Sequence, residues 1–237
     1  MKRPDGRAFD ELRNIEIERN YLKYAEGSCF IKMGNTKVVC SATLDKNVPL
    51  FLKNTNTGWV TAEYGMLPRS THIRVQRDKN SGRNFEIQRL IGRALRSVVD
   101  LKSLGERTIF IDCDVVQADG GTRVASIIGG FISLTDCLYK LYESKTILKF
   151  CITDFLGAIS VGLYKGNYIL DLNFEEDSNA DVDMNIVMKG NGEFVEIQGT
   201  GEHFSFSEKD LQSMIELAKK GIYKIIDLEK NILKDIF

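Results

Sequence analysis

The chain alternates short stretches, in which apolar residues recur at every second position, with longer stretches in which they recur at steps of three and four. The first pattern predicts strands and the second predicts amphipathic helices. Gly34 and Asn35 separate two strand-like runs, which predicts a hairpin. The pattern predicts strands at residues 28–33, 36–43, 107–116, 158–164, 168–172, 182–188 and 193–198, and helices at 83–101, 122–142 and from 207 onwards.

Strands and helices follow one another along the chain, so we expect an α/β or α+β fold. No Pro-rich linker, low-complexity segment or short repeat divides the sequence, which favours a single domain over residues 1–237. Ser207 can cap the last helix, with Asp210 in place of the usual Glu or Gln. Trp59 lies in an apolar run, and we expect it to lie on a buried strand with its ring in the hydrophobic core.

Composition excludes several classes of protein. The 237 residues are 43% hydrophobic and 27% charged, which is typical of folded proteins. No apolar run approaches the roughly 20 residues of a membrane span, and the N-terminal residues lack the apolar core of a signal peptide. Five cysteines without a CxxC pair argue against a disulfide framework and a cysteine zinc site, and they favour the cytoplasm.

Charge is distributed unevenly along the chain. With 32 basic and 33 acidic residues, the formal net charge is −1, which excludes a globally basic nucleic-acid binder. Residues 69–96 nevertheless contain eight basic and two acidic residues, whereas residues 171–237 contain 15 acidic and seven basic residues. The basic segment suits a polyanion such as RNA.

Part of this basic segment lies on the predicted helix at residues 83–101. Arg89, Arg93 and Arg96 are spaced to share one face of it. We interpret these three as structural or interface residues, and Glu86 can pair with Arg89. Arg83 stands at the start of the helix, where it can reach a phosphate group.

A glycine pair precedes the predicted helix at residues 122–142. Gly120 and Gly121 allow the backbone to approach a ligand closely, and the helix N-terminus adds unpaired N–H donors. Thr122 can donate a hydroxyl hydrogen, and Arg123 can bind two oxygens at once. This arrangement predicts an oxyanion site, although no Walker loop is present. The alternative is a tight turn in which Thr122 caps the helix.

Acidic residues cluster after the predicted strand at residues 168–172. Asp181 and Asp183 share a face if they lie on a strand, and Asp177 reaches them only if the chain turns between them. Clustered carboxylates suit Mg²⁺ or Mn²⁺ and can serve as a general acid. The alternative is a solvated acidic loop. The cluster comprises Asp171, Glu175, Glu176, Asp177, Asp181 and Asp183.

Residues 58–71 place aromatic side chains directly before arginines. Aromatic rings stack on unpaired bases, and arginines bind phosphates, so this segment also fits RNA. Neither His72 nor His203 has a metal-ligand spacing, and we find no support for histidine-based zinc or Ser-His-Asp chemistry.

Longer motifs then resemble one family, bacterial ribonuclease PH, over nearly the whole chain. The resemblance implies a fold similar to domain 2 of ribosomal protein S5, with βαβ units. The motifs are RPDGR (3–7), GWVTAEYGMLP (58–68), EIQRLIGR (86–93), DCDV (112–115), QADGGTR (117–123), ED (176–177), DMN (183–185) and EIQGT (196–200).

The resemblance implies a phosphate-dependent 3′→5′ exoribonuclease, which is a nucleotidyltransferase that trims the 3′ ends of tRNA precursors. It also implies a homohexameric ring built as a trimer of dimers. The family's phosphate-binding positions match Arg83, Gly121, Thr122 and Arg123. Its catalytic carboxylates, which act with a divalent metal, match Asp177 and Asp183. Its RNA-binding arginines match Arg69, Arg74 and Arg77.

The residues and the resemblance therefore lead to one expected mechanism. Inorganic phosphate attacks the terminal phosphodiester, and arginines offset the repulsion between the two anions. The sequence leaves open whether Asp183 or a metal-bound water protonates the leaving oxygen. One alternative is an inactive RNA-binding ring subunit, which we expect to lack the GTR triplet or the acidic pair; both are present. The other is a hydrolytic nuclease, which needs no phosphate and releases monophosphates.

Overall fold

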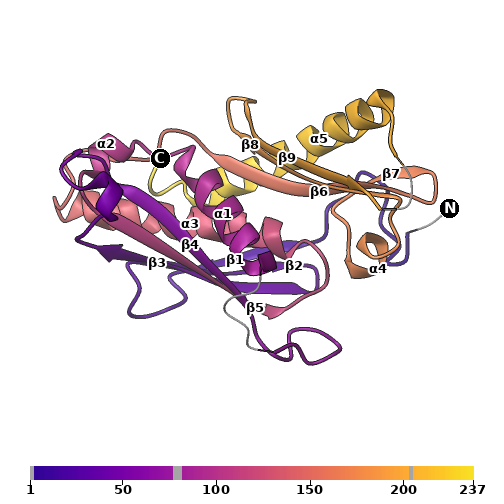
Figure 1. The fold of residues 1–237 in the computed structure, drawn as a ribbon, viewed down its shortest axis with the longest axis horizontal. Helices are drawn as coiled ribbons and strands as arrows, with labels where there is room; N and C mark the ends of the chain where they lie inside the picture. Colours follow the sequence, from indigo (N-terminus) through magenta and orange to yellow (C-terminus); the bar gives the residue numbers. More distant parts are fainter. Residues whose placement is uncertain (1–2, 77–81, 203–204) are drawn as a thin grey trace.

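The computed structural model describes residues 3–76, 82–202 and 205–237, and it contains two β-sheets (Figure 1). The first five strands are β1 (Ile15–Arg19), β2 (Gly27–Met33), β3 (Thr36–Asp45), β4 (Trp59–Met66) and β5 (Thr108–Gln117). They form one sheet in the order β1-β2-β3-β5-β4. The other strands are β6 (Leu156–Tyr164), β7 (Asn167–Leu170), β8 (Val182–Lys189) and β9 (Phe194–Gly201). They form the second sheet in the order β7-β6-β8-β9.

Helices connect and cover these sheets. They are α1 (Gly82–Arg96), α2 (Leu101–Leu104), α3 (Thr122–Glu143), α4 (Phe174–Asp177) and α5 (Glu208–Ile232), with a 3-10 turn η1 at Leu50–Leu52. Strands β4 and β5 are parallel, and α1 and α2 lie between them in the chain, so they form a βαβ unit. The mixed α/β class predicted from the sequence is therefore confirmed.

The helix α3 lies between the two sheets. It contacts β2, β3 and β5 of the first sheet and β6 of the second, and one cluster of buried apolar side chains extends through both sheets. By length and composition alone this helix could cross a membrane, but 89% of its apolar 18-residue stretch is buried inside the fold. Such burial is typical of the core helix of a globular protein.

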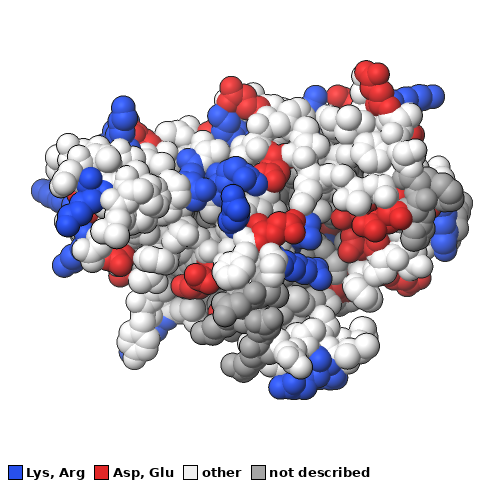
Figure 2. All heavy atoms as spheres, viewed as in Figure 1, with Lys and Arg blue, Asp and Glu red and all other residues white. Residues whose placement is uncertain are grey.

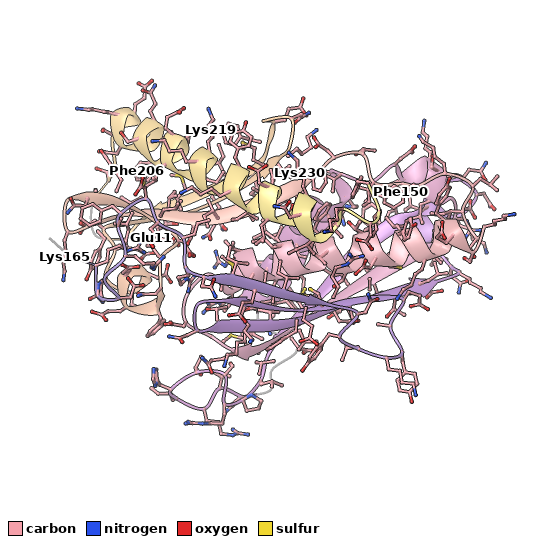
Figure 3. The ribbon with its side chains drawn as sticks, turned by 180° about the vertical axis from the view of Figure 1, so that it is seen from behind. Glu11, Phe150, Lys165, Phe206, Lys219 and Lys230 are labelled. Carbon is pink, nitrogen blue, oxygen red and sulfur yellow. The ribbon has the colours of Figure 1, made fainter. Side chains whose placement is uncertain are left out.

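The helix α5 covers the second sheet, where it contacts β6, β7 and β8. Figure 3 shows it from behind, with Phe206 near its start and Lys219 and Lys230 along its length. Ser207 accepts a hydrogen bond from the Asp210 amide, and Asp210 accepts one from the Ser207 amide, so the predicted capping box is present. Near the other end of α5, both carboxylate oxygens of Glu229 are buried without a hydrogen-bond partner in the described structure.

Two predicted elements end earlier in the structure than the sequence analysis placed them, and two elements were missed. The helix predicted at residues 83–101 ends at Arg96, because Val99 pairs with Ile152 and Asp100 caps α2. The strand predicted at residues 168–172 ends at Leu170, since Asp171 takes a left-handed conformation with φ of 54°. The sequence analysis did not predict β1 and α4 at all.

Two expected side-chain environments were wrong. Trp59 lies on β4 but is only partly buried, and the guanidinium carbon of Arg96 lies 4.1 Å from the centre of its ring. This cation–π contact replaces the predicted core position. Within the described ranges, no ion pair joins Glu86 to Arg89; Glu86 instead accepts a hydrogen bond from Gln198.

Candidate active site

A pocket of about 460 Å³ is lined by residues from both sheets and from three helices. The chain segments that line it are the end of β4, the residues after it, the start of α1, the turn before α3 with the first residues of α3, and parts of β6, α4 and β8. Because these segments are distant in sequence, the fold itself creates the pocket. It contains all six residues predicted to bind phosphate or to act in catalysis: Arg83, Gly121, Thr122, Arg123, Asp177 and Asp183.

The turn before α3 is built from two glycines in the left-handed conformation. Gly120 has φ of 73° and Gly121 has φ of 68°, a region that other residues enter at a cost. A Cβ atom on Gly120 would lie 2.6 Å from the carbonyl oxygen of Leu172. Glycine is therefore required for the turn to pack against the chain that leads into α4.

The structure decides between the two interpretations of Thr122. Gly121 is the residue that caps α3, and no side chain caps this helix end. Thr122 is the first helical residue, and its hydroxyl shares a hydrogen bond of 2.9 Å with the Tyr64 hydroxyl. The alternative in which Thr122 caps the helix is therefore wrong. The first N–H groups of α3 have no partners within the helix and can serve an anion.

The glycine turn is also held from outside the pocket. Arg13 donates a hydrogen bond of 2.7 Å to the carbonyl oxygen of Asp119, and the Thr36 hydroxyl donates one of 2.6 Å to the carbonyl oxygen of Gly120. Arg13 also forms an ion pair with Asp171, at 2.6 Å between Nη2 and Oδ1. The sequence analysis missed Arg13, because no local motif marks it and its contacts are with residues far along the chain.

Two arginines converge on the pocket from different helices. Arg83 lies at the start of α1 and is exposed, and Arg123 lies in the first turn of α3. Burial raises the pKa of Asp177, while the charges of Arg123 and Arg83 both act to lower it. Both arginines therefore lie close enough to this carboxyl to influence its ionisation. A dianion that enters the pocket would meet two positive charges.

The two predicted carboxylates meet in the same pocket. Asp183 lies on β8, and the chain turns after α4 to bring Asp177 beside it. Burial and then the nearby charge of Asp177 raise the pKa of Asp183 to about 7. Asp183 Oδ1 is buried and has no hydrogen-bond partner within residues 3–76, 82–202 and 205–237. Asp181, in contrast, precedes β8 and does not line the pocket.

The acidic cluster is thus partly a structural element. Residues 174–177 form α4 rather than the solvated loop that was the alternative. Glu176 is fully buried and accepts hydrogen bonds from Arg3, and it also closes a capping box with Asn173. The cluster therefore contains two buried acids that hold the fold, Asp171 and Glu176, and two acids that face the pocket, Asp177 and Asp183.

The pocket carboxylates fit a magnesium ion better than a metal with an all-protein ligand set. The part of the chain that the structure describes has no group of three or more metal-ligating side chains. Mg²⁺ commonly takes one or two carboxylates together with water and substrate phosphates. The unpartnered Oδ1 of Asp183 and the adjacent Asp177 would supply those carboxylates.

Two of the three arginines predicted to bind RNA lie at the surface. Arg69 and Arg74 are exposed in the segment after β4, and four residues of this segment line the pocket: Thr71, His72, Ile73 and Val75. Arg77 lies outside the described residues. In Figure 2 basic atoms gather over the region of α1, and acidic atoms lie over α4 and its surroundings. The basic surface therefore borders the pocket.

The arginines that we interpreted as structural or interface residues form contacts away from the pocket. Arg93 forms an ion pair with Glu196 of β9, at 2.6 Å, and Arg96 donates a hydrogen bond to the carbonyl oxygen of Val60. Arg89 is exposed. These contacts fasten α1 to both sheets.

Comparisons with known proteins identify the family of the chain. The model of the 3′ exoribonuclease family, domain 1, matches residues 11–139, and the model of its domain 2 matches residues 154–221. The chain is 56% identical to ribonuclease PH of Bacillus subtilis over 98% of this chain and 97% of that protein. It is 53% identical to ribonuclease PH of Bacillus cereus, over 99% and 98% of the two chains.

Solved structures show the same fold at low sequence identity. The Archaeoglobus fulgidus exosome with RNA bound to the active site superposes with a TM-score of 0.80 and 22% identity, over 94% of this chain and 91% of that one. The family models cover most of the chain, and the relatives match it from end to end. The chain therefore belongs to the 3′ exoribonuclease family and is a phosphorolytic 3′→5′ exoribonuclease.

Proposed function

We propose that inorganic phosphate binds between the glycine turn and Arg83, and that it attacks the last phosphodiester of an RNA chain there. The observation that carries this proposal is the convergence of two arginines and two carboxylates in one pocket. The arginines come from α1 and α3, and the carboxylates come from α4 and β8. To bring inorganic phosphate to an RNA phosphodiester, the site needs arginines that bind the anions and carboxylates that can hold a divalent cation.

The arginines and the turn solve the problem of bringing two anions together. Arg83 and Arg123 offset the charge of the incoming phosphate, and Thr122 and the first amides of α3 can hydrogen-bond to its oxygens. Holding the nucleophile in position converts a bimolecular step into an effectively unimolecular one. This positioning is the main contribution that we assign to these residues.

The reaction transfers the terminal nucleotide to phosphate. A phosphate oxygen forms a bond to the phosphorus of the terminal phosphodiester, and the bond from that phosphorus to the 3′ oxygen of the preceding nucleotide breaks. The 3′ oxygen takes up a proton, and a nucleoside diphosphate leaves. Because the new phosphoanhydride bond conserves much of the energy, the reaction can run in both directions.

Asp177 and Asp183 would hold Mg²⁺ or Mn²⁺ beside the scissile phosphate. The cation supplies electrostatic stabilisation of the charge on the leaving 3′ oxygen. Burial and the charge of Asp177 raise the pKa of Asp183 to about 7, so a cation that binds this carboxylate would compete with a proton near neutral pH. Cation binding and proton release at Asp183 are therefore coupled.

We further propose that the substrates include tRNA precursors with extended 3′ ends, in the cytoplasm, and that the exposed Arg69 and Arg74 bind the RNA upstream of its end. A homohexameric ring, as a trimer of dimers, would place such arginines around the entrance. The likeness of this fold to an exosome chain with RNA at its active site supports this proposal.

The products of the reaction test the central claim. Purified protein, Mg²⁺ and an end-labelled RNA are incubated with and without inorganic phosphate, and the products are separated by chromatography. We expect nucleoside diphosphates with phosphate and no shortening without it. Monophosphates in both reactions would identify a hydrolytic nuclease, and RNA binding without any product would identify an inactive subunit.

A further inference from the structure

A chain of three polar side chains connects the two phosphate-binding helices through strand β9. Arg123 Nη1 donates a hydrogen bond of 3.2 Å to Gln198 Oε1, and Gln198 Nε2 donates one of 2.7 Å to Glu86 Oε1. Arg123 belongs to α3, Gln198 to β9 and Glu86 to α1. Arg83 lies one turn before Glu86 on the same helix. The chain therefore links the elements that carry the two arginines of the pocket.

The side-chain amide of Gln198 has an oxygen that can only accept a hydrogen bond and an NH₂ group that can only donate one. The guanidinium of Arg123 can only donate, so it must face the amide oxygen. The carboxylate of Glu86 accepts, so it must face the amide NH₂ group. The two partners therefore fix the orientation of the amide. Because one N–H of Arg123 is used in this way, the direction in which its other N–H groups point is restricted.

The neighbouring position on β9 shows what a carboxylate does in the same setting. Glu196 lies two residues before Gln198, on the same side of the strand, and binds Arg93 of α1 with hydrogen bonds of 2.7 and 2.9 Å. That pair neutralises its arginine and fastens α1 to β9. At position 198 the amide holds an arginine without neutralising it, so the charge of Arg123 stays available for an anion.

We propose that Gln198 and Glu86 are positioning residues that aim the guanidinium of Arg123, which forms no ion pair among the described residues, at the phosphate site. This inference rests on the proposed binding of phosphate by Arg123. It assigns affinity for phosphate, rather than for RNA, to the Glu86–Gln198–Arg123 chain. Neither residue needs to touch the substrate.

The test compares a nearly isosteric change with a matched break of the other α1–β9 contact. In Gln198→Glu, a carboxylate replaces the amide, pairs with Arg123 and faces Glu86 with a like charge. We expect the KM for phosphate to rise at least about tenfold, since an oxyanion competes for Arg123. The KM for RNA should stay within about twofold. Arg93→Met removes the neighbouring ion pair but leaves the polar chain intact, and we expect its phosphate KM to stay within about twofold of the original protein.

Glu86→Ala provides a second variant, since Glu86 is exposed and its loss should leave the fold intact. We expect a smaller rise in the phosphate KM, about threefold, because the amide loses the acceptor that orients it. Thermal unfolding of each variant accompanies the kinetics. An unchanged phosphate KM in Gln198→Glu and Glu86→Ala, or an equal rise in Arg93→Met, would overturn the proposal. If the unmodified protein turned over RNA without phosphate, the proposed function itself would be wrong, which is a separate result.

Discussion

Glu176 and Asp177 are neighbours in α4, yet one belongs to the framework of the protein and the other to its pocket. Glu176 is fully buried, and Arg3 donates hydrogen bonds of 2.7 Å to each of its carboxylate oxygens. Arg3 also donates to the carbonyl oxygens of Leu170 and Asp171. Asp177 instead lines the pocket, where burial raises its pKa.

The framework around Arg3 and Glu176 and the pocket both use arginines and carboxylates. They differ in how many of the polar atoms on these side chains have hydrogen-bond partners within the protein. Arg3 directs its donors to protein acceptors, whereas Arg123 makes a single hydrogen bond within the described ranges, to Gln198. Asp183 likewise keeps an unpartnered oxygen. Buried charges are normally paired and hydrogen-bonded, because leaving them unpaired is costly. Unused bonding capacity at this pocket therefore indicates ligand binding, and full bonding indicates a structural role.

The largest effect should follow from removing the charge of Asp183. Asp183→Asn keeps the shape of the side chain but removes the carboxylate, so we expect turnover to fall to background while RNA still binds. Phosphorolysis assays and fluorescence anisotropy with labelled RNA measure the two quantities. Loss of RNA binding together with turnover would place Asp183 in the framework instead.

Arg123→Ala tests the arginine side of the pocket. It removes a donor that stabilises phosphate where charge develops, so we expect the phosphorolysis rate to fall by about 10²-fold or more. The rate is measured at saturating RNA over a range of phosphate concentrations. Near-normal turnover at every concentration would contradict the assignment of Arg123 to the phosphate site.

Arg3→Met should show the opposite behaviour, a loss of stability. It removes the closer of the two arginines that pair with the buried Glu176 and leaves Arg7, whose Nη2 lies 3.6 Å from Glu176 Oε2, so we expect a loss of about 3 kcal/mol in the free energy of unfolding. The matched variant Arg123→Met should change this free energy by less than about 1 kcal/mol. Urea unfolding measures both. Equal destabilisation by the two variants would erase the distinction between framework and pocket.

Glu229 extends the comparison to a carboxyl in neither region. Burial raises its pKa well above the ordinary value and outweighs the nearby Leu156 amide, which acts to lower it. An acid with a raised pKa in the folded state destabilises the fold progressively as the pH rises above the ordinary pKa. We therefore expect Glu229→Gln to stabilise the protein by about 1–3 kcal/mol at pH 8 and by much less at pH 4. An identical difference at both pH values in urea unfolding would refute this.

The smallest effect concerns the exposed arginines outside both regions. Replacing Arg69 and Arg74 together by alanine should weaken the binding of long RNA several-fold. Since two phosphate contacts are lost, the slope of log K for RNA binding against log salt concentration should become shallower by about 1.4. Cleavage of dinucleotides should change little. An equal loss for long and short substrates would argue against RNA contacts at these positions.

Local patterns were sufficient for much of the fold. The apolar spacing predicted α3, α5 and β5 to within a few residues, because these elements bury a continuous face. The end of α1 could not be predicted in this way. It depends on the pairing of Val99 with Ile152, which lies far along the chain.

The pocket shows the same limit. The GTR triplet and the acidic pair could be identified as motifs, and the structure brings them together. Arg13 and Gln198 could not be assigned, because their contacts join residues 106 and 75 positions apart. Trp59 was misplaced because an apolar run does not reveal that an arginine will cover the ring.

The contact between Arg3 and Glu176 joins residues 173 positions apart. Domains generally fold as units while the ribosome synthesises the chain from its N-terminus. Arg3 leaves the ribosome before Glu176, so their ion pair can form only after most of the polypeptide has been translated. The glycine turn is made much earlier than either carboxylate of the pocket. A nascent chain therefore has no complete catalytic centre, and translation must pass Asp183 before the enzyme can degrade any transcript.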